Sequence, residues 1–247
     1  MGNLEPHIRL SEEMGLRCAL LAGDPARLDR LALHLQDVRE LAYNREYRSL
    51  CGTYKGVEVL AMSTGIGGAS MAIAVEELRH IGVEAAIRIG SAGSYQPGIG
   101  LGELILASGA VRDDGASKTY APAEFPAVAD PELFRCCMAA AEEYGAVSHA
   151  GIVRSHDSFY TDREDEICAY WSRFGVLCGD METAALFTVG ALRGLKAASI
   201  LNNVVLYQSD TAEGIDQYVD GDSVTAEGEK AEIITALEAL VKWKAKR

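Results

Sequence analysis

The first informative segment ends in Arg27, a residue that could bind an anion. This arginine follows Gly23-Asp24-Pro25-Ala26, which comes directly after the apolar run at residues 18–22. A glycine turn from a strand into a helix leaves backbone N–H groups free for an anion, and Asp and Pro are typical of a helix start. A capped helix with a solvated arginine has the same pattern. The segment therefore indicates either an anion site or an ordinary helix start.

A second arginine, Arg88, lies inside the apolar run at residues 85–89. A buried guanidinium is costly unless a negative group meets it. Because Gly90-Ser91-Ala92-Gly93 follows, we expect a turn there, which places Arg88 at the carboxyl end of a strand. Open α/β sheets bind ligands at this end. A structural salt bridge would explain the same residue, so both roles stay open.

Two more segments combine glycine or acidic residues with a helix start. The glycines of Ser63-Thr64-Gly65-Ile66-Gly67-Gly68-Ala69-Ser70 would let a ligand approach the backbone, although the segment is neither a P-loop nor a dinucleotide fingerprint. Gly179-Asp180-Met181-Glu182 precedes a helix rich in small residues. Glu182 alone would be a first-turn carboxylate that favours the helix dipole.

The elements that must position these residues alternate along the chain. Apolar runs predict strands at 18–22, 57–63, 85–89, 103–108, 150–154 and 197–201, and amphipathic patterns predict helices at 25–35, 70–80, 132–144, 182–193 and 227–246. The alternation predicts an α/β sandwich with a largely parallel sheet, in one domain over residues 1–247. Loops are expected at 93–102 and at 207–224, where the second carries Asp210, Glu213, Asp216, Asp220 and Asp222.

Composition limits the class of protein. With 247 residues, 49% of them hydrophobic and 24% charged, the chain resembles an average globular enzyme. A net charge of −13 disfavours nucleic acids and anionic membranes as partners. The six cysteines form no CxxC pair and have no zinc-type spacing, so we expect reduced thiols and a cytoplasmic location. Neither a signal peptide nor an apolar run of the ~20 residues that span a bilayer is evident.

Taken together, the segments resemble one family, the hexameric-type nucleoside phosphorylases, which include uridine phosphorylases and bacterial purine nucleoside phosphorylases. The resemblance runs from His7 to about Val205 and is closest to uridine phosphorylase. The motifs that carry it are Asn44-Arg45-Glu46, Ser63-Thr64-Gly65-Ile66-Gly67-Gly68, Val111-Arg112-Asp113-Asp114-Gly115-Ala116-Ser117 and Glu124-Phe125-Pro126-Ala127-Val128-Ala129-Asp130. The family implies a three-layer α/β/α sandwich with a mixed, largely parallel central sheet. It also implies inorganic phosphate as co-substrate, no organic cofactor, and a homohexamer built from dimers that acts in nucleoside salvage.

The resemblance further implies which residues bind each part of the substrates. The implied phosphate site consists of Gly23, Arg27, Arg88, Ser91 and an Arg45 supplied by a neighbouring subunit. The implied ribose contacts are Met181, Glu182 and a neighbouring subunit's His7. Phe159 would stack on the base, and the potassium ion that some uridine phosphorylases hold between subunits would contact Glu46, Ile66 and Ser70. If Arg45 and His7 come from another chain, the active site exists only in an oligomer.

This assignment is chemically consistent. Breaking an N-glycosidic bond builds positive charge on the ribose and negative charge on the departing base. Three arginines would hold a phosphate dianion beneath C1′, so that the nucleophile is positioned and its charge faces the growing cation. Guanidinium groups suit phosphate oxygens better than ammonium groups do. Glu182 would hydrogen-bond the ribose hydroxyls and favour the cationic sugar.

The sequence departs from its relatives at the leaving group. The aspartate that protonates the purine in the bacterial purine enzymes corresponds to Val205, which cannot donate a proton. The Gln and Arg that contact uracil in uridine phosphorylases correspond to Arg163 and Asp165. Arg163 could still reach a uracil carbonyl and stabilise the leaving group. Alternatively, it pairs with Asp162 or Glu166 in a surface loop.

We therefore favour a uridine-type nucleoside phosphorylase, and three alternatives remain. The first is a purine nucleoside phosphorylase with relocated base contacts. The second is a nucleosidase that uses water, although such an enzyme would not need Arg27, Arg45 and Arg88 together. The third, from a different class, is a catalytically inactive nucleoside-binding protein. Sequence alone does not decide the base preference.

Overall fold

The computed structural model describes residues 3–209, 214 and 223–247. Its strands are β1 (Cys18–Ala22), β2 (Gln36–Asn44), β3 (Tyr47–Tyr54), β4 (Val57–Ser63), β5 (Ala85–Ser94), β6 (Leu104–Asp113), β7 (Ala127–Val128), β8 (Ser148–His156), β9 (Cys178–Asp180) and β10 (Lys196–Val205). Its helices are α1 (Arg27–Ala32), α2 (Gly68–His80), α3 (Gly115–Tyr120), α4 (Pro131–Tyr144), α5 (Glu164–Ser172), α6 (Thr183–Arg193) and α8 (Ser223–Lys244), with a short 3-10 turn, η1 (Glu12–Met14).

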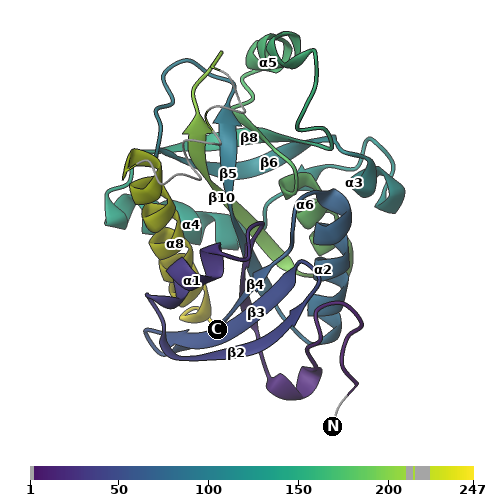
Figure 1. The fold of residues 1–247 in the computed structure, drawn as a ribbon, viewed down its shortest axis with the longest axis vertical. Helices are drawn as coiled ribbons and strands as arrows, with labels where there is room; N and C mark the ends of the chain where they lie inside the picture. The colour runs from purple at the N-terminus through teal and green to yellow at the C-terminus, as the bar shows by residue number, and fades with distance from the viewer. Residues whose placement is uncertain (1–2, 210–213, 215–222) are drawn as a thin grey trace.

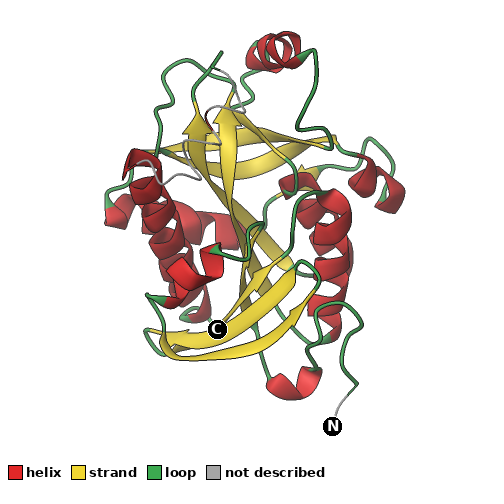
Figure 2. Ribbon diagram, viewed as in Figure 1, coloured by secondary structure: helices red, strands yellow, loops and turns green. Residues whose placement is uncertain are grey.

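The strands form one mixed sheet between two helical layers (Figure 1). Their order is β10-β6-β8-β9-β5-β1-β4-β3-β2, and β10 also pairs with β5, so that β5, β9, β8, β6 and β10 close into a ring. Parallel pairs join β4, β1, β5 and β10. Helices α1, α4 and α8 cover one side of the sheet, and α2, α3 and α6 cover the other (Figure 2). The predicted three-layer sandwich with a mixed sheet is confirmed.

Strand β1 explains why the central strands are continuous apolar runs in the sequence. Successive side chains of a strand point to opposite faces of the sheet. Ala19 and Leu21 pack into the hydrophobic core on one face, while Cys18, Leu20 and Ala22 pack into the core on the other. A strand buried on both faces needs no polar alternation. All six cysteines are free and buried, as the sequence led us to expect.

Helix ends follow the residues that can cap them. The Asp130 side chain accepts hydrogen bonds from the first backbone N–H groups of α4, with Pro131 in the first turn. Gly145 ends α4 with φ of 77°, and Gly194 ends α6 with φ of 70°. A residue without Cβ adopts this left-handed conformation at little cost. None of the described helices combines the length and apolar character that a membrane-spanning helix needs.

The antiparallel hairpin of β2 and β3 was not expected from the sequence. The helix predicted at 25–35 is shorter, and β2 already begins at Gln36. Strand β2 is mostly exposed at the edge of the sheet, so it lacks the apolar pattern of a buried strand. Asn44 pairs with Tyr47 across a two-residue turn, in which Arg45 has a φ of 56°.

The prediction of a turn at residues 90–93 is also wrong, because β5 continues through these residues to Ser94. Gly90 pairs with Leu201 of β10, so Arg88 lies within the strand rather than at its end. A Cβ on Gly90 would lie 2.5 Å from Arg88 Nη2, which explains the glycine as space for the guanidinium. The loop expected at 207–224 and its five acidic residues lie largely outside the described residues.

Candidate active site

A cavity of about 640 Å³ lies along the second half of β5. Its walls come from the loops after β1, β4 and β8, from β9, and from the end of β10. Seven of the phosphate, ribose and base contacts implied by the family resemblance line it: Gly23, Arg27, Arg88, Ser91, Phe159, Met181 and Glu182. Folding therefore brings the expected phosphate, ribose and base contacts of one chain together.

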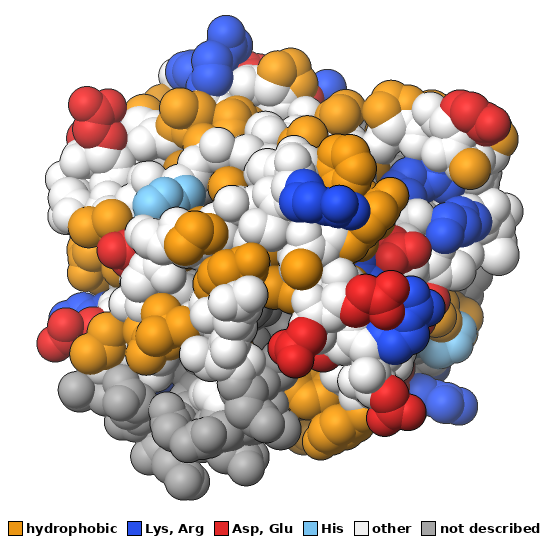
Figure 3. Space-filling model, turned by 90° about the horizontal axis from the view of Figure 1, so that it is seen from above, with side chains coloured by type: hydrophobic (Ala, Val, Ile, Leu, Met, Phe, Trp, Pro, Cys, Tyr) orange, Lys and Arg blue, Asp and Glu red, His pale blue; other side chains and the backbone are white. Residues whose placement is uncertain are grey.

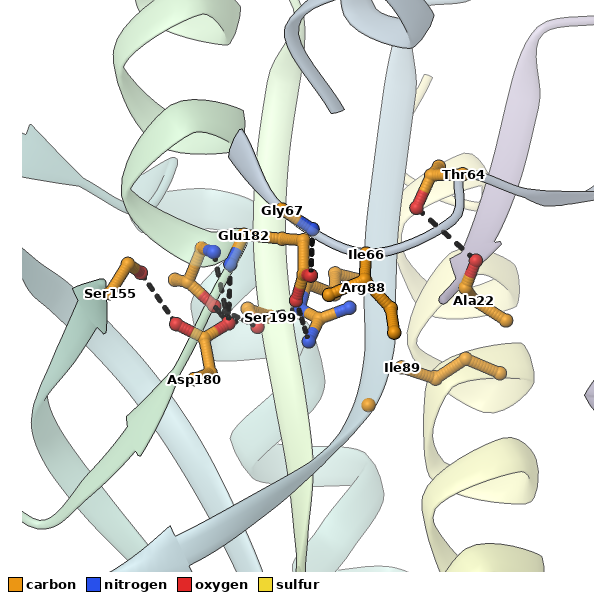
Figure 4. Close-up of polar contacts among 12 residues, drawn as sticks. Ala22, Thr64, Ile66, Gly67, Arg88, Ile89, Ser155, Asp180, Glu182 and Ser199 are labelled. Carbon is orange, nitrogen blue, oxygen red and sulfur yellow. Dashed lines mark hydrogen bonds and ion pairs between the residues drawn. The ribbon is translucent and has the colours of Figure 1, made fainter. Parts of the chain in front are cut away.

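Arg88 lines the cavity and is held between two carboxylates (Figure 4). Its Nε donates to Asp180 Oδ2 at 3.0 Å, and its Nη2 lies 2.5 Å from Glu182 Oε2. Its buried Nη1 has no hydrogen-bond partner among the described residues. Glu182 also accepts the backbone N–H of Gly67 at 2.5 Å. Burial raises the pKa of Glu182, and Arg88 opposes that shift. The arginine is thus fixed from two sides and keeps one donor for an anion.

Asp180 fixes this arrangement to the start of α6. Its Oδ2 accepts hydrogen bonds from the backbone N–H and the hydroxyl of Thr183, at 2.9 and 2.6 Å. Its Oδ1 accepts from Ser155 Oγ at 2.5 Å. Sequence reasoning gave Asp180 no role of its own. An acidic residue two positions before Glu182, at a helix start, was the available signal.

Arg27 is held from behind by two glutamates of α8. Its Nε donates to Glu229 at 3.0 Å, and its Nη1 donates to the Ile89 carbonyl oxygen at 2.9 Å and lies 3.9 Å from Glu232 Oε2. Glu232 Oε1 accepts the backbone N–H of Gly90 at 2.5 Å. Burial raises the pKa of Glu232 to about 8, and the Arg27 charge opposes the shift. Both glutamates escaped the sequence analysis, although their i, i+3 spacing places them on one face of the helix.

Further lining residues give the cavity apolar walls with a few polar groups. Phe159 packs edge-on against Tyr160, with ring centroids 4.9 Å apart. Val205 lies against Gly93 and lines the cavity, so the position of the purine-protonating acid is apolar here. Burial raises the pKa of Glu164, another lining residue.

His7 and Arg45 do not line the cavity of their own chain. Asn44 Nδ2 donates to the His7 carbonyl oxygen at 2.8 Å, which places both predicted residues at the β2–β3 turn. His7 Nδ1 lies 2.5 Å from Glu77 Oε1, and Arg45 is exposed. The two residues that were expected to serve a neighbouring subunit therefore share one surface.

The residues of the expected potassium site lie around Gly65. A Cβ on Gly65 would lie 2.9 Å from Glu46 Cβ and 3.8 Å from Ser70 Oγ, and Ser70 Oγ donates to the Ile66 carbonyl oxygen at 3.3 Å. In the part of the chain that the structure describes, no three His, Cys, Asp or Glu residues are grouped to hold a metal. A potassium site here would combine the single carboxylate of Glu46 with carbonyl and hydroxyl oxygens.

Arg163 is not among the residues that line the cavity. It is exposed at the start of α5 and makes two hydrogen bonds to Glu166, at 2.9 and 3.0 Å. The alternative pairing of Arg163 with Glu166 is therefore the one present, whereas Asp165 does line the cavity.

The face around α5, seen from above, mixes hydrophobic side chains with charges of both signs (Figure 3).

An α/β fold that places two buried arginines and a buried carboxylate in one cavity is suited to an anion beside a polar organic ligand. The model of the phosphorylase superfamily matches residues 17–239, and the chain belongs to this superfamily.

Individual relatives are similar over most of their length. Uridine phosphorylase from Thermococcus kodakarensis is 41% identical over 209 residues, which cover 80% of this chain and 76% of that protein. Guanosine phosphorylase from Halorubrum lacusprofundi is 37% identical over 196 residues, covering 79% and 81%. A crystal structure of uridine phosphorylase from Vibrio fischeri ES114 with 6-hydroxy-1-naphthoic acid has a TM-score of 0.90 and 48% identity, covering 97% of each chain.

Proposed function

We propose that the protein is a nucleoside phosphorylase of nucleoside salvage that cleaves uridine with inorganic phosphate to uracil and ribose 1-phosphate. The observation that carries the proposal is Arg88, which is fixed by two carboxylates in the cavity that also contains Arg27 and Glu182. Similarity to uridine phosphorylases over about four fifths of the chain supports the choice of uridine.

The reaction follows from the positions of these groups. Arg88, Arg27 and Ser91 hold phosphate at one end of the cavity, while Glu182 and Met181 hold the ribose above it. A phosphate oxygen forms a bond to C1′ as the C1′–N bond breaks, and the bonding electron pair leaves with the base. Glu182 accepts hydrogen bonds from ribose hydroxyls and faces the positive charge that develops on the sugar. Val205 carries no proton, so we expect the base to take up its proton from water after the bond has broken.

We further propose that the site is completed by a second copy of the chain. Arg45 and His7 lie together on one surface outside their own cavity, which suits residues that contact a neighbour's phosphate and ribose 5′-hydroxyl. The assembly is a cytoplasmic homohexamer built from such dimers, with one catalytic domain per chain. Glu46, Ile66 and Ser70 hold a potassium ion between the subunits of each dimer.

A purine nucleoside is the second candidate substrate. A guanosine phosphorylase is among the relatives, with 37% identity to this chain. Against a purine, the position of the protonating aspartate is Val205, so a purine would need another group to stabilise its departure.

A panel of nucleosides tests the proposal. The purified protein is incubated with uridine, thymidine, inosine and adenosine, with and without phosphate, and the released bases are separated by chromatography. Uracil release that requires phosphate is the expected result. Base release at the same rate without phosphate would identify a nucleosidase, and the absence of any release would indicate a binding protein.

A further inference from the structure

Two polar side chains of the cavity wall, Tyr95 and His156, have no role in the phosphate and ribose sites. Both line the cavity and approach Gly179, which comes just before the ribose-binding pair Met181 and Glu182. A Cβ on Gly179 would collide with Tyr95 Oη and would lie 3.4 Å from His156 Nε2. The two side chains therefore share the space that this glycine leaves open.

We propose that Tyr95 and His156 recognise the lactam edge of the base: Tyr95 Oη donates to a ring carbonyl oxygen, and His156 Nε2 accepts the adjacent ring N–H. The assignment rests on the proposed function, and it names the substrate class as nucleosides of uracil-type or 6-oxopurine bases. Cytosine and adenine lack this edge, since each presents an unprotonated ring nitrogen beside an amino group.

The hydrogen bond of His156 determines which nitrogen can accept. Its Nδ1 lies 2.9 Å from the Ser158 carbonyl oxygen, which accepts only, so Nδ1 carries the proton of the neutral ring. Nε2 is left as an acceptor and has no hydrogen-bond partner among the described residues. Burial lowers the pKa of His156, and the Arg154 charge lowers it further, while Asp180, Asp113 and the Ser158 carbonyl act in the opposite sense. The ring is therefore neutral near pH 7.

Arg154 also makes Tyr95 a suitable donor. Arg154 Nη1 donates to Tyr95 Oη at 2.9 Å, and its Nε donates to Asp113 at 2.8 Å, so the guanidinium is fixed behind the phenol. Burial raises the pKa of Tyr95, which keeps its proton on the hydroxyl. A hydroxyl polarised by a guanidinium can stabilise the negative charge that develops on the carbonyl oxygen of the departing base.

The residues that contact uracil in related enzymes do not provide these groups here. Arg163 is bound to Glu166 and does not line the cavity, and Asp165, which does, has an exposed carboxylate that can only accept. Tyr95 and His156 supply one donor and one acceptor on the same side of the cavity. A lactam presents the complementary acceptor and donor on adjacent atoms.

Methylated nucleosides test the inference. The steady-state kcat/KM of wild type is compared for uridine and 3-methyluridine, and for inosine and 1-methylinosine, because the methyl group removes only the ring N–H. Wild type should lose at least about 10-fold on methylation. In His156→Ala the two members of a pair should differ by less than about 3-fold, whereas His156→Gln, whose amide oxygen can accept the same N–H, should restore the preference. Tyr95→Phe should lower kcat for both members about equally.

His149→Ala is the matched control, because His149 lies on the same strand, β8, but outside the cavity. It should keep the wild-type ratio. Equal ratios in wild type and His156→Ala, or no methyl effect in wild type, would overturn the inference and leave phosphorolysis intact. If wild type released no base from any nucleoside in the presence of phosphate, the proposed function itself would fail.

Discussion

Replacing Asp180 by asparagine tests whether Arg88 must be held in place to bind phosphate. The substitution keeps the size of the side chain but removes its charge. Asp180 accepts hydrogen bonds from Arg88 and Thr183 through Oδ2 and from Ser155 through Oδ1. An amide has only one accepting oxygen and no charge, so the Arg88 contact is weakened in either orientation of the side chain, and the Ser155 contact can lose its acceptor.

The size of the effect follows from the Arg88 contact. A hydrogen bond between charged groups contributes roughly 1.5–3 kcal/mol, and about 1.4 kcal/mol corresponds to a tenfold change. We expect Asp180→Asn to lower kcat/KM for phosphate by about 10- to 100-fold, mainly through a higher KM for phosphate. Losing the Ser155 contact should lower the Tm by a few degrees, because about 1 kcal/mol shifts a chain of this size by roughly 2–4 °C.

The assay is uracil release at saturating uridine with varied phosphate. Asp37→Asn provides the control, since Asp37 is exposed on strand β2 and does not line the cavity, and it should behave like wild type. If folded Asp180→Asn gave phosphate kinetics within about twofold of wild type, Arg88 would not depend on Asp180, and the reasoning would be refuted.

Three further predictions concern groups around the cavity. Glu232 has a pKa of about 8 in the folded state and about 4.5 in the unfolded chain, so the stability of the wild type should fall as the pH rises from 4.5 to 8. In Glu232→Gln the Tm should fall less steeply over this pH range. Parallel curves of Tm against pH for the two proteins would contradict the raised pKa. Arg45→Ala and Glu182→Gln should each be nearly inactive, yet co-expression should recover part of the activity, because a mixed dimer contains one intact site; no recovery would argue against a shared site. Arg163→Ala should leave uridine cleavage within about twofold of wild type, because its ion pair lies outside the cavity, and a loss above about tenfold would return Arg163 to the base site.

The parts of the fold that the sequence predicted best are those with a continuous buried apolar run. The strands at 18–22 and 57–63 have the predicted bounds, because the first is apolar throughout and the second contains the buried apolar run from Val59 to Met62. The β2 strand was missed because an exposed edge strand carries no such pattern. The extension of β5 was missed because its glycines resemble a turn, and only the packing of Arg88 over Gly90 shows why they are needed.

The residues of the candidate site also fall into those that the sequence indicated and those that it did not. Arginine and glycine at the ends of apolar runs marked the segments that meet at the cavity. Glu229 and Glu232 could not be recognised, because their helix reaches Arg27 only through tertiary packing across about 200 residues of chain. The proposed role of Arg45 requires a second copy of the chain, which no single sequence pattern specifies.

The central claim is that phosphate, and not water, is the nucleophile that attacks C1′ of the ribose. Phosphorus-31 NMR of a reaction with uridine and phosphate measures this directly, when the uracil released is quantified in the same sample. One ribose 1-phosphate for each uracil, with an equal loss of inorganic phosphate, is the predicted result. Uracil accompanied by free ribose and an unchanged phosphate signal would contradict it.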